Sequence, residues 1–347
     1  MGSQSAEAKS SPREVPEPRP SSSVLLLSPS NEILLLHRVK TSTSYASAHV
    51  FPGGNLDPFH EGPLPEPASP ERHRDGPAYR MGAIRETFEE TGILLASRDG
   101  ALVNLPLHER DKARKEIHEN KVKFGDFLDS IGAVADTAGL LPFTRWITPA
   151  NNYSKRFTTQ MYLYMLPVSQ RGVPSQMHVP TPDGGVEHTA ALFAPAQTFL
   201  EQAAGNIIIL FPPQVYLMTL LTRFLTGHAV DVEASTLHYM GQRKKLLRFL
   251  RHKLTAETDA GKRHRTASIL WGDKVICPYA IGYREQEKRA IMALDKAGPE
   301  LKGTTDGGDW ERVVLVRFGK GGPSNVEVRL REQVLEEQRR MESEAKL

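Results

Sequence analysis

The run Arg85-Glu86-Thr87-Phe88-Glu89-Glu90-Thr91-Gly92-Ile93 constrains this chain of 347 residues more than any other segment. It places three carboxylates within five positions, directly after an arginine, in a stretch that predicts a helix. At about 100° per residue, Glu89 lies about 60° to one side of Glu86 and Glu90 about 40° to the other, so all three share one face. Bound cations would relieve their repulsion, and hard oxygen donors suit Mg²⁺ or Mn²⁺.

A solvated acidic helix face is the usual interpretation of such a charge run. Two features argue against it here. Apolar residues flank the run at Ile84, Phe88 and Ile93, which predicts a half-buried helix. Upstream lies Phe51-Pro52-Gly53-Gly54, a turn whose glycines allow the backbone to approach an ion or a ligand closely.

Together the two segments resemble the signature of the Nudix superfamily, in which a glycine loop leads into a helix ending Arg-Glu-apolar-x-Glu-Glu-x-Gly-apolar. The helical half matches from Arg85 to Ile93, with Thr87 in the apolar slot. The first half departs, because the glutamate expected six residues after Gly54 is replaced by His60, and Glu61 lies one step further. The sequence therefore leaves open which carboxylate pairs with the signature arginine.

An insertion of roughly 17 residues separates the two halves, since Gly54 and Arg85 are 31 positions apart. The stretch 55–77 carries six prolines and predicts an irregular loop. An interrupted signature of this kind is similar to the peroxisomal coenzyme A diphosphatase branch of the superfamily. The similarity continues through residues 34–38, 48–57, 145–149 and 155–159 and covers roughly residues 23 to 225.

The resemblance implies a site with Mg²⁺ or Mn²⁺ as cofactor. Glu86 and Glu90 would be metal ligands, the carbonyl of Gly53 would complete the inner shell, and Glu89 would be a further ligand or the base for water. Arg85 would fix the rotamer of Glu89 from one helical turn away. The residues that we expect to contact substrate are Arg38, Phe51, Gly54, Arg156 and Glu187.

The predicted elements are strands and helices in mixed order along the chain. Strands are expected at 24–27, 33–39, 143–147, 157–166 and 186–193, and helices at 78–91, 107–120, 124–131, 195–204 and 213–225. This pattern agrees with the α/β/α sandwich with a mixed sheet that the resemblance implies. We expect a disordered tail at 1–22, the Nudix domain at 23–230, and a C-terminal extension at 231–347 with a basic helix at 243–253 and a hairpin around Gly319-Lys320-Gly321-Gly322.

The predicted activity is metal-dependent hydrolysis of the diphosphate bond in a nucleoside diphosphate linked to another moiety. Coenzyme A or an acyl-coenzyme A is the favoured substrate, giving adenosine 3′,5′-bisphosphate and a phosphopantetheine. The alternatives are a diphosphatase for NADH, ADP-ribose or a nucleotide sugar, and a non-catalytic Nudix-fold binding or regulatory protein. The sequence does not fix the oligomeric state, and it leaves open which role the C-terminal extension has.

The composition and the two chain ends limit which partners other than a nucleotide-type substrate are expected. A net charge of +3 is too small to favour nucleic acid, and no apolar run reaches the roughly 20 residues that span a bilayer. The single cysteine, Cys277, predicts a buried structural thiol. Ala345-Lys346-Leu347 fits a peroxisomal address, which would make a peroxisomal import receptor a partner; the cytoplasm is the alternative location.

Overall fold

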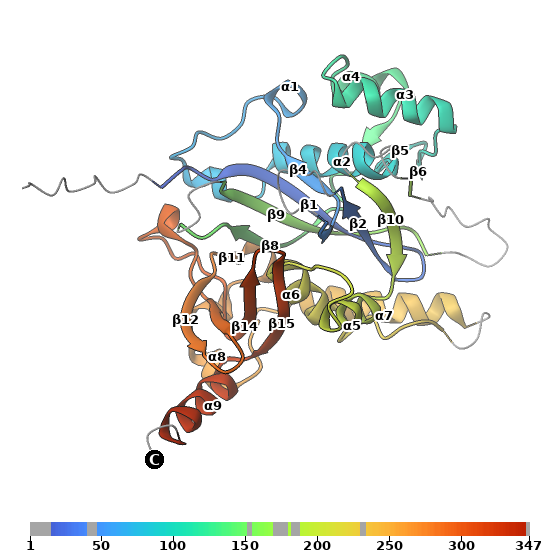
Figure 1. Cartoon of the computed structure of the whole chain (residues 1–347). Coiled ribbons are helices and arrows are strands. Elements are labelled where there is room, and N and C mark those ends of the chain that lie inside the picture. Colours follow the sequence, from blue (N-terminus) through green and yellow to red (C-terminus); the bar gives the residue numbers. More distant parts are fainter. Residues whose placement is uncertain are drawn as a thin grey trace, which may run out of the picture.

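The computed structural model describes residues 15–39, 47–150, 155–168, 180–181, 188–229 and 234–344. Its centre is an eight-stranded mixed sheet with the strand order β10-β2-β1-β9-β8-β11, in which β3 pairs with β2 and β4 with β1 (Figure 1). The strands are β1 (Arg19–Leu27), β2 (Ile33–Arg38), β3 (His49–Val50), β4 (Gly53–Asn55), β8 (Leu141–Ile147), β9 (Phe157–Met165), β10 (His188–Ala194) and β11 (Val275–Ile276).

Strand β1 lies beside two neighbours in the sheet and is apolar on both faces. Its backbone pairs in parallel with β9 from Arg19 to Leu27. Val24 and Leu26 enter one buried cluster and Leu25 and Leu27 the other, as the alternation of side chains along a strand requires. The predicted tail is therefore wrong at its end: β1 begins at Arg19, because this pairing supplies partners for its backbone before the apolar run starts.

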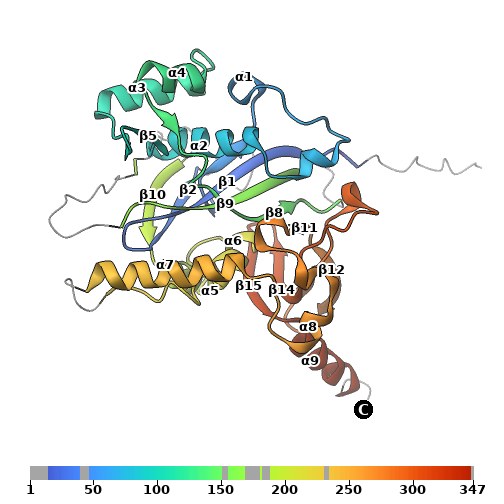
Figure 2. The same cartoon turned by 180° about the vertical axis from the view of Figure 1, so that it is seen from behind.

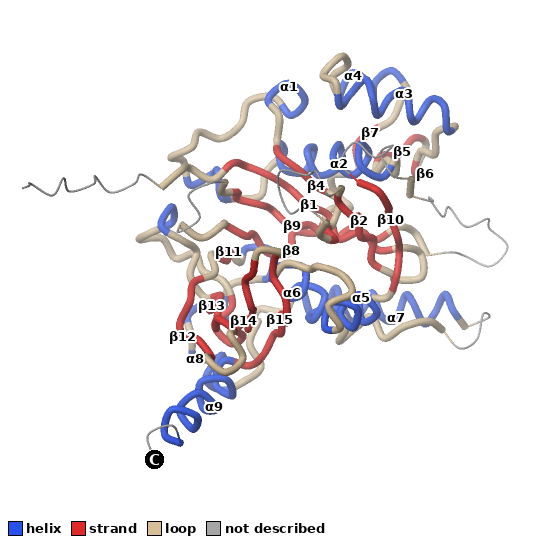
Figure 3. The backbone as a smooth tube through the Cα atoms, viewed as in Figure 1, coloured by secondary structure: helices blue, strands red, loops and turns tan. Residues whose placement is uncertain are grey.

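Helices cover both faces of the sheet, which confirms the predicted α/β/α architecture (Figure 3). One face carries α2 (Pro77–Thr91), α3 (Leu107–His118) and α4 (Phe124–Ser130). The other carries α5 (Ala196–Ala204), α6 (Pro212–Leu221) and α7 (Ser235–Arg251), which are seen from behind in Figure 2. No helix in the described ranges combines the length and the apolarity that crossing a bilayer needs.

The signature helix α2 begins and ends where its sequence predicts. Pro77 occupies its first turn, where no intrahelical N–H bond is lost, and Gly92 ends it in the left-handed conformation with φ of 73°. Thr87 is fully buried in the apolar slot, because its hydroxyl donates to the carbonyl of Ala83 at 2.7 Å. The helix therefore presents its carboxylates from a fixed position.

The insertion is irregular over 62–69 and 74–76, as its prolines predict, but it also contains two short helical turns. It begins with a short helix, α1 (Pro58–Glu61), and later forms the 3₁₀ turn η1 (Pro70–His73). Asp57 caps α1 by accepting a hydrogen bond from the N–H of Phe59 at 2.9 Å, and Pro58 fits the first helical turn. Asp57 and Pro58 thus start a short helix within a stretch that was predicted to be an irregular loop throughout.

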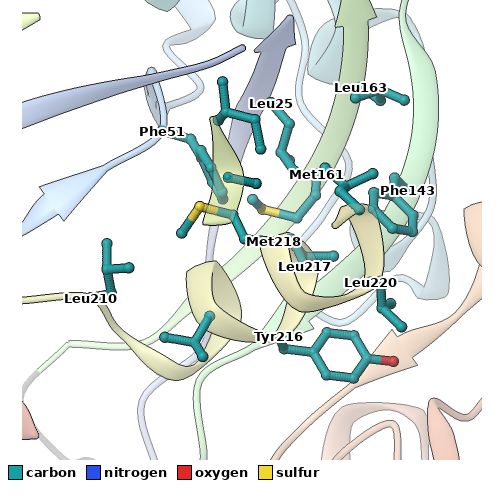
Figure 4. Packing of buried hydrophobic residues seen from close by; sticks show 14 of the residues in the cluster. Leu25, Phe51, Phe143, Met161, Leu163, Leu210, Tyr216, Leu217, Met218 and Leu220 are labelled. Carbon is teal, nitrogen blue, oxygen red and sulfur yellow. The ribbon is translucent and has the colours of Figure 1, made fainter. Parts of the chain in front are cut away.

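Helix α6 packs into the core beneath the sheet. Leu217 and Met218 of α6 share a buried cluster with Leu25 and Met161 of the central strands and with Phe51 of the glycine turn (Figure 4). This cluster also contains Leu294 and Val314, so residues on both sides of position 230 share one core.

The C-terminal part forms an antiparallel sheet with the order β12-β13-β14-β15. The predicted hairpin is confirmed as β14 and β15, and two further strands that the sequence did not predict extend it. Its elements are β12 (Tyr279–Arg284), β13 (Arg289–Leu294), β14 (Asp309–Gly319), β15 (Gly322–Leu330), α8 (Asp259–Arg263) and α9 (Arg331–Glu344). A small separate sheet is formed by β5 (Ala96–Arg98), β6 (Ala101–Leu102) and β7 (Val134–Ala135).

Candidate active site

Arg85 is the centre of the signature region and is almost fully buried. Its Nε donates to Glu61 Oε1 at 2.7 Å, its Nη1 to Glu89 Oε1 at 2.7 Å, and its Nη2 to the carbonyl of Asn55 at 2.9 Å. Nη1 also lies 2.9 Å from Glu86 Oε1. Burial alone would lower the pKa of Arg85, but Glu86, Glu61 and Glu89 outweigh burial and raise it, so the guanidinium stays charged.

Glu61 is the carboxylate that the spacing of the signature left open. Its side chain is fully buried beside Arg85, and its Oε2 also accepts the N–H of Asp57 at 2.6 Å. The sequence contained the residue, one position beyond the expected slot. Helix α1 accounts for the shift, because Asp57 and Pro58 start a helical turn that directs Glu61 inward. Glu61, which belongs to the insertion, therefore takes the place of the glutamate that usually pairs with the signature arginine.

Glu86 lies against the glycine turn. A Cβ atom added to Gly54 would stand 2.5 Å from the Glu86 carboxylate, so only glycine leaves space for that side chain in its present rotamer. Gly53 is equally constrained, since it has φ of 152° and its Cβ would approach the carbonyl oxygen of Ser22 to 2.3 Å. Both glycines are needed for the backbone of the turn to reach the carboxylates of α2.

Glu90 faces the same turn from the last part of the helix. It accepts the N–H of Gly53 through Oε2 at 2.7 Å, and its Oε1 lies 3.6 Å from His188 Nε2. His188 is fully buried at the start of β10. His188 was not among the predicted site residues, although it is adjacent to Glu187; Glu187 itself lies outside the described residues. The place of His188 in the sequence, shortly after the Asp-Gly-Gly turn at 183–185, could have indicated that it lies at the site.

Helix α3 holds Glu89 from the opposite side. His118 Nδ1 lies 3.2 Å from Glu89 Oε2, and Arg114 Nε donates to the carbonyl of Glu89 at 2.8 Å. Burial raises the pKa of Glu89, but the hydrogen bond from His118 and the charge of Arg85 outweigh burial and lower it. Glu89 is therefore ionised at neutral pH. Neither His118 nor Arg114 was predicted, because α3 reads as an ordinary charged helix.

The carboxylates open into a cleft of about 1720 Å³. It is lined by eight of the predicted residues: Arg38, Phe51, Gly53, Gly54, Arg85, Glu86, Glu89 and Glu90. Arg19, Arg114, Lys115 and Lys155 add positive charge along its walls. This volume exceeds the roughly 300–1,000 Å³ of most small-molecule pockets.

Arg156 does not lie in the cleft, so the prediction that it contacts substrate is wrong. Its guanidinium is buried, pairs with Glu300 at 2.5 Å, and donates to the carbonyls of Pro16 and Thr148. Arg156 therefore ties the start of β9 to the C-terminal part and to the segment before β1. No local pattern indicates this ion pair, because Glu300 is distant along the chain. Cys277 is buried as predicted, and burial raises its pKa to about 11.

The donor chemistry of this region fits a divalent cation: three carboxylates line one cleft together with the glycine turn, and Gly54 leaves space for one of them. In the described part of the chain, no three His, Cys, Asp or Glu side chains converge into a complete cage. Arg85, His118 and the N–H of Gly53 hold the carboxylates instead. A complete cage is not required, since Mg²⁺ keeps several waters and binds one or two carboxylates plus substrate phosphates.

Residues 68–221 match the family model described as the NUDT19 Nudix domain. The matched range includes α2 and α3 but begins after the glycine turn and α1. Nudix hydrolases generally use divalent metal ions.

Curated relatives have similar descriptions. "Acyl-coenzyme A diphosphatase NUDT19" of Gallus gallus is 28% identical over 240 residues, which cover 56% of this chain and 61% of that protein. The protein of the same name from Xenopus laevis is 26% identical over 237 residues, covering 56% and 60%. "Putative nudix hydrolase 7" of Caenorhabditis elegans is 27% identical over 143 residues, covering 41% and 42%. The chain thus spans about three fifths or less of the length of these relatives.

Solved structures with a similar chain path include a NUDIX hydrolase from Alicyclobacillus acidocaldarius, with a TM-score of 0.48 at 22% identity over 63% of this chain and 96% of that chain. A MutT NUDIX hydrolase from Burkholderia pseudomallei has a TM-score of 0.28 at 16% identity, covering 52% and 86%.

Proposed function

The chain belongs to the Nudix hydrolase superfamily, in the branch of the NUDT19 Nudix domain, and from this premise we propose that it cleaves the diphosphate bond of coenzyme A or of an acyl-coenzyme A. The printed name of the chicken and frog relatives, acyl-coenzyme A diphosphatase, favours this substrate within the class. The expected products are adenosine 3′,5′-bisphosphate and a phosphopantetheine.

One observation carries the proposal. The guanidinium of Arg85 binds Glu61 and Glu89 together and lies beside Glu86, at the end of a cleft that Glu90 also lines. The buried charges satisfy one another, so breaking any pair would leave a costly unpaired charge. Such an arrangement is expected where carboxylates have to be held in fixed positions for chemistry.

Each residue would have a distinct role. Glu86, Glu90 and the carbonyl of Gly53 would supply oxygens to Mg²⁺ or Mn²⁺, which would neutralise charge on the diphosphate and acidify a water molecule. Glu89, whose pKa lies below its ordinary value, would act as a further ligand or accept the proton of that water. Arg85 would keep the carboxylate of Glu89 in one rotamer through their 2.7 Å hydrogen bond.

Positive side chains in the cleft would bind the phosphate groups. Arg38 and Lys155 line the cleft from the end of β2 and from the segment before β9. Phosphoryl transfer depends mostly on such positioning and electrostatic stabilisation.

The test is mass spectrometry of the products after incubation with coenzyme A, dodecanoyl-coenzyme A, NADH and ADP-ribose, each with Mg²⁺ or Mn²⁺. We expect cleavage of the two coenzyme A compounds. Preferential cleavage of NADH or ADP-ribose would favour the rival substrate class. No cleavage of any compound would favour a non-catalytic Nudix-fold protein.

Two variants test whether turnover depends on the carboxylates. Glu89→Gln should lower kcat by roughly 10²–10⁴-fold, the usual range for losing a group that moves a proton. Glu90→Gln removes a proposed metal ligand and should also remove nearly all turnover. Glu109→Gln is the matched control, because Glu109 lies exposed on α3 and does not line the cleft. Retained activity in both test variants would refute the assignment.

Peroxisomal location remains a proposal from Ala345-Lys346-Leu347, which lies outside the described residues. Fluorescence microscopy of an N-terminal fusion that leaves these residues free, with and without the final leucine, tests it. A diffuse cytoplasmic signal from the intact fusion would contradict it.

A further inference from the structure

The C-terminal sheet contributes to the same cleft as the signature helix. Pro278, Met292, Leu294, Val314 and Phe318 line the cleft together with the carboxylates of α2. Phe211 and Pro213 extend this apolar surface at the start of α6. These contacts give the C-terminal part of the chain, whose role was open from the sequence alone, a place in the site.

Strand alternation explains why these residues face the cleft side. On β13 and β14, Met292, Leu294 and Val314 belong to or pack on the core beneath the main sheet. Their neighbours Val313 and Leu315 pack instead with Val334 of α9 on the opposite face. The C-terminal sheet therefore has two apolar faces, one covered by its own helix and one directed at the Nudix core.

Hydrogen bonds fix this sheet against the main body. β11 pairs in parallel with β8, and the N–H of Arg145 donates to the carbonyl of Lys274 at 2.7 Å. Tyr216 of α6 donates to Asp309 of β14 at 2.8 Å, in a buried contact. The apolar side of the cleft is thus held by the core beneath the main sheet, which also contains Phe51 of the glycine turn.

We propose that Met292 and Phe318, with Phe211 and Pro213, form an apolar wall that binds the fatty acyl chain of an acyl-coenzyme A. The inference rests on the proposed function, since it concerns the substrate tail whose diphosphate lies at the carboxylates. The continuity of the cleft from Glu86 to Phe318 supports it, as does a volume larger than a nucleotide alone would need.

The wall has a measurable consequence for selectivity. Each methylene buried against it tightens binding by about fourfold. Free coenzyme A has no acyl chain, so its turnover should not depend on the wall. The ratio of kcat/KM for dodecanoyl-coenzyme A to kcat/KM for free coenzyme A therefore measures the contribution of the wall separately from that of bond cleavage.

Two substitutions test this ratio. Phe318 is 60% exposed, so Phe318→Ser removes apolar surface without opening a core cavity. Met292→Gln keeps the length of the side chain and changes its polarity. We expect each to lower the ratio by about five- to tenfold while leaving kcat/KM for free coenzyme A within twofold. Leu237→Ser and Met240→Gln are the matched controls, because both residues are exposed on α7 and neither lines the cleft.

Binding without turnover gives an independent measurement. Calorimetric titration in EDTA should show a more negative heat-capacity change for dodecanoyl-coenzyme A than for coenzyme A, and Phe318→Ser should reduce this difference. An unchanged ratio, or equal losses with both substrates, would overturn the inference. If the wild type binds the acyl compound through the wall but cleaves neither compound, the inference stands and the proposed function fails.

Discussion

The signature helix and the C-terminal sheet border one cleft with opposite chemistry. On α2, Arg85 and the glutamates around it form a dense set of buried, charge-assisted hydrogen bonds. On β13 and β14, Met292 and Phe318 offer only apolar surface, and the strands that carry them are held by packing. A charged wall of this kind can hold carboxylates in fixed positions for a reaction. An apolar wall can distinguish substrates by the apolar area that each of them buries.

The two walls also differ in how much a single change should cost. Removing one partner from the charged wall leaves an unpaired buried charge, whereas removing an exposed apolar group from the other wall loses only contact area. Substitutions on α2 should therefore reduce all turnover, and substitutions at the wall should change only preference. The predictions below test this difference, starting with the largest effect.

Arg85→Lys should cause the largest loss. A lysine cannot reach Glu61, Glu89 and the carbonyl of Asn55 together, because its ammonium lacks the planar fork. Breaking these buried pairs should lower kcat/KM for free and acylated coenzyme A alike by about 10³-fold, or about 4 kcal/mol. Steady-state kinetics measure this, with the exposed Arg74→Lys as control. A loss confined to the acyl substrate would contradict the separation of the two walls.

Lys274 should make stability depend on pH in the C-terminal part. Burial lowers its pKa from 10.5 to about 8 while its ammonium donates to the carbonyls of Thr266 and Gly308. Between pH 8 and 10.5 the unfolded chain binds more protons at this site, so the contribution of Lys274 to stability rises with pH by up to about 3 kcal/mol.

Urea unfolding at pH 7.5 and pH 10, for wild type and Lys274→Met, measures this contribution. The free energy of unfolding of the wild type should rise relative to that of the variant as pH increases. The comparison between the two proteins removes the effect of buried tyrosines such as Tyr162, whose raised pKa acts in the opposite direction. A parallel pH profile for both proteins would contradict the prediction.

Tyr216→Phe should have the smallest effect. It removes one hydrogen bond to Asp309, while Arg312 keeps its own contact with that carboxylate at 3.0 Å. We expect a loss of about 2 kcal/mol in the free energy of unfolding, measured by urea titration, with turnover of free coenzyme A unchanged. Tyr283→Phe, on the exposed side of β12, serves as control. Equal stability of the two variants would mean that this contact does not attach the C-terminal sheet.

The sequence predicted the parts of the site that depend on local spacing. The helix from Arg85 to Gly92 and the glycine turn were identified because helical periodicity and glycine geometry act over a few residues. Glu61 was not assigned, because the insertion moved it by one position and only the start of α1 at Asp57 explains where it points.

Other features depend on contacts between distant segments. His118 and the apolar wall reach the cleft, and His188 reaches Glu90, through tertiary packing that no local pattern encodes. Arg156 was misassigned for the same reason, since its partner Glu300 is brought close only by the fold. β12 and β13 were missed because their short mixed runs carry little alternation.

The most direct test of the central claim is anomalous diffraction from a crystal of the full chain soaked in Mn²⁺. The account predicts a peak within coordination distance of carboxylate oxygens of Glu86 and Glu90, next to the carbonyl of Gly53 and facing the cleft. A soaked crystal with no peak there, and with the three glutamates still held only by Arg85, His118 and the turn, would contradict it.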